Sequence, residues 1–390
     1  MQRDPRLRHR HSPNPHPHPP HPGAHPPHPG AHPPHPGAHP PHPCAIVPPE
    51  LLRRIAQNGT RSQREAALAT LSSDHSLRFA RATTQWMGGG GRRFTLTAGE
   101  FTPRRTIFDA GHRESLPGKA VRAEGQRAGR DPEVNEAYDG LGATFAFFAR
   151  VYDRNSIDDA GMPLEASVHF GVRYDNAFWN GHQMVFGDGD GEIFNRFTAS
   201  LDVIGHELTH GITADEANLV YLGQAGALNE SISDVFGSLV KQYTLGQTAA
   251  EADWLIGEGL FTRRVKGMAL RSMKAPGTAF DDPVLGKDDQ PATMAGYVHT
   301  TADNGGVHTN SGIPNHAFYL VAIALGGHAW DVAGRVWYET LRDRRLKPNA
   351  TFRQFAMLTV RNAAQNLGAP ERNAVAAAWQ SVGIAVAPSG

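Results

Sequence analysis

Apolar side chains recur at helical spacing over most of the second half of the chain and in one earlier stretch. This spacing predicts a helix at residues 133–153 and two more at 201–212 and 226–240. Further helices are predicted toward the C-terminus, each ending at a glycine or a polar turn, in segments 315–327, 328–341, 351–368 and 371–384. The C-terminal part of the chain is therefore expected to be α-helical.

Residues 94–199 show a different pattern, rich in glycine and in alternating apolar and polar positions. In the stretch ASVHFGVRY, residues 166–174, the apolar Val168, Phe170 and Val172 alternate with their neighbours, which predicts a half-buried strand. The expected fold class is α+β, with a β-rich N-terminal lobe and an α-helical C-terminal lobe. A substrate site is expected in the cleft between them.

Residues 44–73 predict two short amphipathic helices. The Pro48-Pro49 pair stops an extended apolar entry, and Asn58-Gly59 separates the two apolar faces that follow. Proline and glycine break a helix because proline lacks an N–H group and glycine loses more conformational entropy than other residues.

The composition of the first 43 residues differs from that of the rest. They hold 11 of the 21 histidines and 16 of the 29 prolines, including three copies of HPPHPGA from His18 to Ala38. Such a segment has few apolar side chains to bury, so we expect it to be extended and disordered. Its histidines could chelate zinc or nickel, and a repeat expansion without function is the alternative.

Charge and cysteine content exclude several classes of protein. The 38 basic and 38 acidic residues give no net charge, which argues against nucleic acid or an anionic membrane as an obligatory partner. Cys44 is the single cysteine, so no internal disulfide framework is expected. No apolar run is long enough for a transmembrane helix, and the N-terminus lacks a conventional signal peptide. We expect a soluble monomer, cytoplasmic by default or exported by a non-standard route.

The stretch LDVIGHELTHGI, residues 201–212, places two histidines four positions apart. On a helix His206 and His210 share one face and can reach one ion, while Glu207 lies to one side of that face. The surrounding apolar residues predict a buried helix, in which the imidazoles need a partner. Zinc peptidases use this H-E-x-x-H arrangement, with the glutamate acting on water rather than as a ligand. An isolated histidine pair without a metal is the alternative.

A catalytic zinc site needs a third protein ligand, and the helix predicted at 226–240 supplies one. Glu230 and Asp234 lie at i and i+4 on a common side of that helix, among apolar neighbours. Glu230 is the expected ligand. Asp234 is expected to accept a hydrogen bond from the far nitrogen of a ligating imidazole and so to fix its tautomer.

The order of these motifs resembles the thermolysin-like metallopeptidases. HELTH at 206–210 is followed by NE at 229–230, and further segments match in the same order. They are YDNAFWNG at 174–181, MVFGDGDG at 184–191, LRSM at 270–273 and DNGGVHTNSGIPNHAFY at 303–319. The first two resemble an edge strand and the hairpin after it, and the resemblance covers about residues 105–385.

The resemblance implies a two-lobe fold with one catalytic zinc ion in the cleft. His206, His210 and Glu230 would bind the zinc, and Asn229 and Asp234 would support the ligating histidines.

It also implies the catalytic roles. Glu207 would be the general base and proton shuttle, Tyr221 and His308 would donate to the oxyanion, and Asp303 would orient His308.

For the substrate, the resemblance implies that Asn176, Ala177 and Arg271 hold the peptide backbone. The apolar pocket for the side chain after the scissile bond would be formed by Phe194, Phe197, Val203 and Leu270. The implied activity is cleavage of peptides or proteins on the amino side of bulky hydrophobic residues.

Residues 44–93 are similar to the short prosegment of the protealysin-type subgroup, which implies a zymogen inhibited by its own prosegment. The four expected segments are the tail 1–43, the prosegment 44–93, the lobe 94–212 with the zinc-binding helix, and the lobe 213–390. We expect self-processing between about residues 85 and 96, next to a run of four glycines. The Cys44 thiolate could bind zinc before processing, or Cys44 could be a small buried anchor.

The calcium ligands of the family are matched only in part. Asp202, Asp253 and Glu258 stand at matching positions, but Lys241 and Leu255 replace two oxygen ligands. We expect at most one weak calcium site, with the ammonium of Lys241 in place of the ion.

Two function hypotheses follow. The first is a zinc-dependent neutral endopeptidase made as a self-processing precursor. The second is a metal-sequestering protein in which the histidine tail binds the metal and is carried by an inactive peptidase scaffold. Glu207 discriminates between them, since metal storage has no use for a general base.

Overall fold

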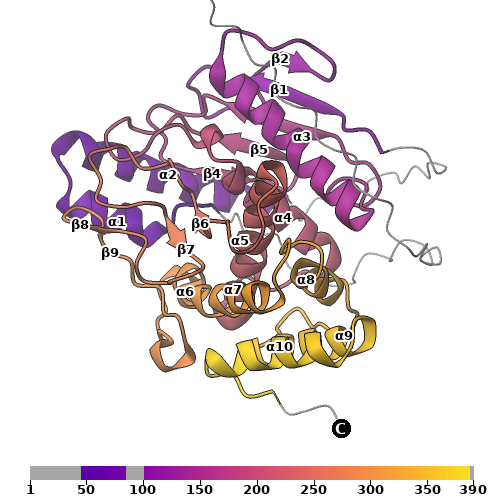
Figure 1. Ribbon diagram of the computed structural model, residues 1–390. Coiled ribbons are helices and arrows are strands. Elements are labelled where there is room, and N and C mark those ends of the chain that lie inside the picture. Colours follow the sequence, from indigo (N-terminus) through magenta and orange to yellow (C-terminus); the bar gives the residue numbers. More distant parts are fainter. Residues whose placement is uncertain (1–44, 85–100, 387–390) are drawn as a thin grey trace, which may run out of the picture. The chain divides into compact units, whose positions relative to one another are not determined.

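The computed structural model of the protein describes residues 45–84 and 101–386, with side chains up to residue 75 in the first range (Figure 1). All of these residues belong to one unit of the chain, residues 35–390. The predicted tail, Cys44 and the predicted processing segment lie outside the described residues.

A five-stranded mixed sheet carries the N-terminal lobe. Its strands are β1 (Arg105–Asp109), β2 (Lys119–Ala123), β3 (Leu164–Val168), β4 (Ala177–Trp179) and β5 (Gln183–Phe186). Their order is β2-β1-β3-β5-β4. The three central strands β1, β3 and β5 are parallel, with Ile107 beside Ala166 and Ala166 beside Met184, whereas the outer strands are antiparallel. The predicted edge strand is β4, which lies at the edge of the sheet. The segment predicted as the hairpin after it contributes one strand, β5, which pairs with β4 and continues into a loop.

The predicted strand at 166–174 is correct only as far as Val168. His169, Gly171 and Arg173 have φ values of 54°, 67° and 54°, in the left-handed region, so the chain turns out of the sheet after β3. Val172 is 69% exposed, although Phe170 is fully buried. Alternating hydrophobicity in this stretch therefore reflects a folded loop rather than a longer strand.

Helix α3 (Pro132–Tyr152) packs on β1 and β3, close to the range predicted for it. Asp131 caps its N-terminus, because its side chain accepts from the backbone N–H groups of Glu133 and Val134, and Pro132 occupies the first helical position. Tyr138, Leu141 and the phenylalanines of α3 are buried in the main core.

Two long helices follow, α4 (Leu201–Glu216) and α5 (Gly223–Leu245), and both are almost fully buried. The C-terminal lobe adds α6 (Asp303–Asn310), α7 (Gly312–Leu325), α8 (Ala333–Leu341), α9 (Phe352–Asn366) and α10 (Ala369–Ser381). The short elements are η2 (Phe197–Ala199), β6 (Leu255–Ile256), β7 (Arg271–Ser272), β8 (Asp281–Asp282), β9 (Gly286–Lys287) and η3 (Met294–Gly296). The predicted division into a β-containing lobe and a helical lobe is confirmed, because the five-stranded sheet lies before α4 in the chain and α5 to α10 follow it.

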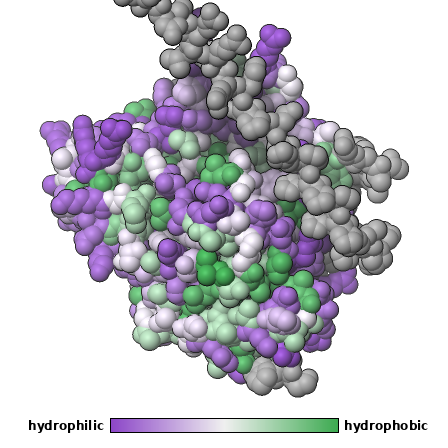
Figure 2. Space-filling view, viewed as in Figure 1, coloured by the Kyte–Doolittle hydropathy of each residue, from purple (hydrophilic) through white to green (hydrophobic). Residues whose placement is uncertain are grey.

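The surface in Figure 2 is largely polar, with apolar residues gathered over the region of α7 and α8. Ile323 of α7 is one of the exposed large apolar residues, at 42%. Among the described helices none has both the length and the hydropathy required to span a bilayer.

The segment predicted to be a prosegment forms α1 (Pro49–Asn58) and α2 (Arg61–Thr84). The second helix, at 24 residues, is longer than predicted. Ile46, Val47, Leu52 and Ile55 are fully buried and belong to the same apolar cluster as the two lobes. The predicted prosegment thus shares one core with the two lobes, and Arg54 of α1 forms an ion pair with Asp289 at 2.5 Å.

Candidate active site

Two glycines let α4 and α5 approach closely. A Cβ atom on Gly205 would lie 3.0 Å from the Cα of Gly237, and one on Gly237 would lie 2.4 Å from the carbonyl oxygen of Asp202. Any larger side chain would push the helices apart. This close crossing places His206 of α4 opposite Glu230 of α5.

The three predicted metal ligands point to one place. The Nε2 atoms of His206 and His210 lie 3.0 Å apart, and they lie 3.5 Å and 3.4 Å from the two carboxylate oxygens of Glu230. Zinc bonds of about 2.0 to 2.2 Å at tetrahedral angles separate ligand atoms by about 3.3 Å. All three side chains are buried.

The hydrogen bonds of the two imidazoles show that these residues fit a cation. The Nδ1 of His206 lies 2.8 Å from Oδ1 of Asp234, and the Nδ1 of His210 lies 2.9 Å from Oδ1 of Asn229. Each Nδ1 thus donates, and each Nε2 presents a lone pair to the other. Burial lowers the pKa of His206 to about 4 and that of His210 to about 3, so both rings are neutral at pH 7. Two lone pairs facing each other at 3.0 Å repel, and a cation bound between them would remove this repulsion.

Glu230 completes this fit. Its Oε1 accepts from the hydroxyl of Tyr221, while its buried Oε2 accepts no hydrogen bond from any described residue. A buried carboxylate oxygen left in this way is costly unless a cation reaches it.

Asp234 links the ligand helix α4 to Arg271, which was predicted to bind substrate. Besides His206 it accepts from Arg271, with Nε at 2.9 Å and Nη2 at 2.8 Å, and from Nδ2 of Asn315 at 2.8 Å. Burial alone would raise the pKa of Asp234, but Arg271 and His206 hold it well below its usual range. Asp234 is therefore ionised and orients two groups at once.

Glu207 lies beside the histidines, with its ligand atom within 4.8 Å of theirs. Its Oε2 accepts from the backbone N–H of Trp179 on β4 at 3.0 Å. The edge strand thereby fixes the orientation of this carboxylate.

Tyr221 and His308 approach Glu230 from the C-terminal lobe. The Nε2 of His308 lies 3.5 Å from Oε2 of Glu230 and 3.3 Å from the hydroxyl of Tyr221. Asp303 accepts from the Nδ1 of His308 at 2.8 Å and from its backbone N–H at 2.9 Å. Burial would lower the pKa of His308, but Asp303 and Glu230 more than offset this and raise it.

A kink at the start of α6 makes the contact between Asp303 and His308. The four residues Asp303 to Gly306 all have positive φ values, from 49° to 86°. Aspartate, asparagine and glycine tolerate this left-handed region better than other residues do. The motif DNGG thus turns the aspartate back onto the histidine that follows it.

Residues Ala45 to Val47 lie against the residues that were predicted to bind the substrate backbone, and they form hydrogen bonds with them. The backbone N–H of Ile46 donates to the carbonyl oxygen of Ala177 at 3.1 Å, and that of Val47 donates to Oδ1 of Asn176 at 2.9 Å. Arg271 donates from Nη1 to the carbonyl oxygen of Ile46 at 3.2 Å. The predicted prosegment therefore pairs with the edge strand through backbone hydrogen bonds, as a peptide would.

Little space remains beside this segment. A cavity of about 40 Å³ is lined by Pro48 and Leu51 of the predicted prosegment and by Leu270, Arg271 and His308, among others. It has room for only a few water molecules. Of the predicted pocket residues, Leu270 lines this cavity, whereas Phe194, Phe197 and Val203 are fully buried in the core behind it.

Lys241 lies among the predicted calcium ligands. Its Nζ is 2.7 Å from Asp253, 3.0 Å from Glu258 and 3.5 Å from Asp202. Leu255 is in strand β6. Burial would lower the pKa of Lys241, but Asp202 and Asp253 raise it, so the ammonium remains charged among the carboxylates.

Three contributors to the site were not predicted. Asn315 binds Asp234, Ser233 places its hydroxyl 3.0 Å from the Nδ1 of His210, and the Trp179 backbone holds Glu207. Each lies within one of the motifs or predicted helices named above, but its position there does not distinguish it from an ordinary polar or core residue.

Comparison with known families finds two matching models. "Thermolysin metallopeptidase, catalytic domain" matches residues 85–214, and "Thermolysin metallopeptidase, alpha-helical domain" matches residues 217–384.

Individual proteins match over most of the chain. An "Extracellular metalloprotease" of Pectobacterium carotovorum is 54% identical, over 88% of this chain and 97% of its own length. "Protease PrtS" of Photorhabdus sp. is 47% identical, over 87% and 92%. Among solved structures, the precursor of protealysin, a metalloproteinase from Serratia proteamaculans, matches with a TM-score of 0.81 and 54% identity, covering 88% of this chain and all of that one.

Proposed function

Because this chain belongs to the thermolysin family of metallopeptidases and is of the protealysin type, we propose that it is a neutral endopeptidase that cuts before bulky hydrophobic residues and is made as a self-processing precursor. The protein is a zinc metalloendopeptidase. We propose, beyond this, its substrate preference, the roles of its individual residues and its latency as a precursor.

The observation that carries the proposal is the convergence of two neutral imidazoles and one carboxylate beside Glu207. His206, His210 and Glu230 would hold the zinc ion. When bound, zinc supplies a Lewis acid that polarises the scissile carbonyl and makes water a stronger acid.

The remaining steps belong to side chains of this chain. Glu207 takes a proton from the attacking water onto a carboxylate oxygen and passes it to the leaving amine. Tyr221 and His308 donate hydrogen bonds to the oxygen that becomes negative, and Asp303 keeps His308 oriented for this role and raises its pKa. Asn176, Ala177 and Arg271 bind the substrate backbone where they now bind Ile46 and Val47.

The preference for bulky residues tests the function directly. An apolar pocket at Leu270 gains about 1.5 to 3 kcal/mol from burying a leucine or phenylalanine side chain, which corresponds to about 10- to 150-fold in rate. We expect kcat/KM of the processed enzyme to be larger by about this factor for furylacryloyl-Gly-Leu-amide than for the Gly-Gly analogue. Equal rates would contradict the preference, while absence of any hydrolysis would contradict the peptidase itself.

Latency is proposed to follow from the binding of residues 45–47 to the edge strand β4. Replacing Ile46 with aspartate puts an unpaired charge where the side chain is fully buried, at a cost of several kcal/mol. We expect the unprocessed precursor then to hydrolyse a small peptide at least about tenfold faster in its initial rate.

The matched control is Leu68→Asp, because Leu68 lies on α2 of the same prosegment but is 57% exposed. It should leave the initial rate unchanged. Equal initial rates for wild type and Ile46→Asp, with the precursor shown to be intact by mass, would rule out inhibition by this strand.

We also propose that Lys241 makes bound calcium unnecessary. Excess calcium is expected to leave the thermal midpoint of the wild-type protein unchanged. Lys241→Met should cost about 3 kcal/mol, because three carboxylates lose their cation, and calcium should then restore part of the loss. Differential scanning calorimetry with and without calcium checks both expectations, and a calcium-dependent midpoint in the wild type would contradict the replacement.

The metal-sequestration hypothesis receives no support from the site or the comparisons. The relatives are named as proteases, and the oriented carboxylate of Glu207 has no purpose in storage.

A further inference from the structure

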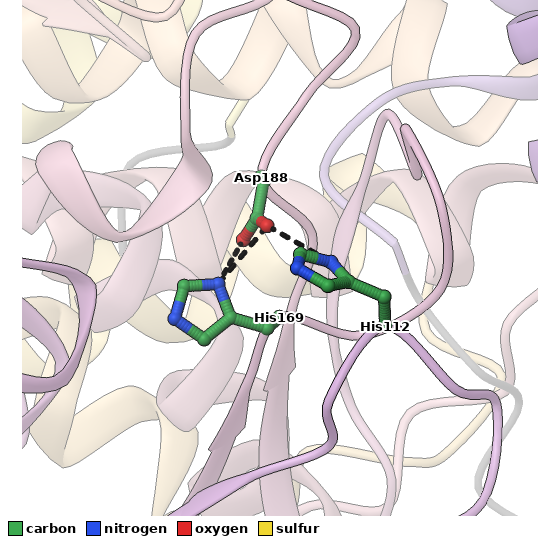
Figure 3. A group of neighbouring side chains, drawn as sticks. All are labelled: His112, His169 and Asp188. Atoms are coloured by element: carbon green, nitrogen blue, oxygen red, sulfur yellow. Dashed lines mark hydrogen bonds and ion pairs between the residues drawn. The ribbon is translucent and has the colours of Figure 1, made fainter. Parts of the chain in front are cut away.

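A second group of potential metal ligands lies outside the cleft, where three neighbouring strands end (Figure 3). His112 follows β1, His169 directly follows β3, and Asp188 follows β5. Because β1, β3 and β5 are adjacent and parallel, their carboxyl ends meet at one edge of the sheet. The backbone N–H of His112 donates to the carbonyl oxygen of His169 at 2.8 Å, which holds the two loops together.

The distances match those between the ligands of one metal ion. The Nδ1 of His169 lies 3.0 Å from both carboxylate oxygens of Asp188, and the Nδ1 of His112 lies 3.5 Å from Oδ2 of the same residue. All three ligand atoms lie within 4.8 Å of one another. Metal bonds of about 2.0 to 2.2 Å require separations of about 3.3 Å. Figure 3 shows both rings turned toward the carboxylate.

The orientation of His169 is fixed from its other side. Its Nε2 lies 3.0 Å from Oδ2 of Asp131, whose Oδ1 caps α3. A carboxylate that accepts from the far nitrogen of an imidazole leaves the near nitrogen for a metal, as Asp234 does for His206. A second cluster of Asp131, Glu133 and His169 uses that far nitrogen, and it is the weaker candidate because Asp131 is already engaged by the helix cap.

The backbone at both histidines is unusual. His112 and His169 have φ values of 57° and 54°, in the left-handed region, which is uncommon for residues other than glycine although histidine is enriched there. Strained conformations of this kind are kept where the surrounding structure requires a side chain in one position.

We propose that His112, His169 and Asp188 form a second metal site, for a divalent transition metal of the zinc class. Two imidazoles and one carboxylate favour zinc, cobalt or nickel over calcium or magnesium, which prefer oxygen ligands. The site is reached from solvent, since the side chain of His112 is 60% exposed, and solvent can supply the fourth ligand.

A metal here would tie the connection between β1 and β2 to the sheet. The same connection carries Glu114, which accepts from the hydroxyl of Ser73 in the prosegment at 2.5 Å. The bound ion would thus stabilise a loop that contacts the prosegment, at a site separate from the catalytic residues.

The test counts metal equivalents in full-length protein carrying Glu207→Gln, so that self-cleavage does not intervene. The hydrogen bonds to Asp188 and Asp131 raise the pKa of His169 to about 9, so a metal must displace a proton, and the titration is done at about pH 8. Cobalt is the probe, because four-coordinate cobalt gives visible absorption bands. We expect the His112→Ala variant to bind about one equivalent of cobalt less per protein than the Glu207→Gln protein without it, and to lose the corresponding absorption bands. Asp188→Asn should have the same effect.

The matched control is His182→Ala, another exposed histidine, which should change neither the stoichiometry nor the spectrum. The histidine tail and the catalytic site are the same in every variant, so the cobalt that they bind does not contribute to the difference between variants. The side chain of His112 is 60% exposed, and beyond its 3.5 Å contact with Asp188 it has a tilted ring contact with His169, whose centroid is 5.4 Å away. Its replacement should therefore leave folding intact, which circular dichroism verifies. Identical stoichiometry and superimposable spectra for folded His112→Ala and its background would overturn the proposal.

Discussion

Replacing Glu207 with glutamine is expected to lower kcat/KM for peptide hydrolysis by about 10³- to 10⁴-fold. Glutamine has nearly the same shape and can still contact the Trp179 backbone, but it cannot accept a proton from water. General acid-base groups contribute about 10²- to 10⁴-fold, and this residue acts in two successive proton transfers. The imidazoles and Glu230 are unaltered, so catalytic metal content should not change.

Two measurements complete this experiment. Intact mass should show that the Glu207→Gln precursor stays whole while the wild type loses its N-terminal residues, with a cut between about residues 85 and 96. A variant lacking residues 1–43 should keep its activity against casein. Activity that survives in Glu207→Gln but disappears with the tail would instead support metal sequestration.

Asp234→Asn is expected to have the largest effect on stability and to weaken zinc binding. Arg271 is buried, and its ion pair with Asp234 is its main compensation. Removing one partner of such a pair costs about 3 to 5 kcal/mol. The same substitution weakens the acceptor that orients His206, for which a loss of about 10- to 100-fold in metal affinity is expected. Urea unfolding and competition with a zinc chelator measure the two effects, in the Glu207→Gln background.

Asp215→Asn is the matched control, because Asp215 also pairs with a buried arginine, Arg154, but far along α4 from the ligands. Arg154 keeps Glu216, and Asp215 is partly exposed, so the loss of stability should be smaller. Zinc affinity should not change. Equal zinc affinity in Asp234→Asn and wild type would show that Asp234 does not orient the ligand.

The pH dependence of the Asp234 contribution has a definite sign. The folded pKa lies below that of the unfolded chain, about 3.9. The stabilisation is therefore fully present above that value and is lost as the pH falls through the folded pKa. The difference in unfolding free energy between wild type and Asp234→Asn should accordingly stay constant from about pH 5 to 8.

The zinc motif could be predicted because its geometry is local. His206 and His210 are one helical turn apart, so a single helix fixes their relation, and the hydrophobic pattern identifies that helix. The same holds for Glu230 and Asp234 on α5. The stretch after Val168 was predicted wrongly because left-handed residues interrupt a strand without changing the hydrophobic alternation.

The sequence by itself determined the helices, the lobes and the chemical types in the site, since these depend on periodicity and on residues near one another in the chain. Tertiary structure alone decided that Gly205 meets Gly237 and so brings Glu230 to the histidines, and that Ile46 lies on Ala177. It also decided that three separate strand ends bring His112, His169 and Asp188 together. Contacts between distant residues depend on how helices and strands pack, and packing requires the whole core rather than any single stretch.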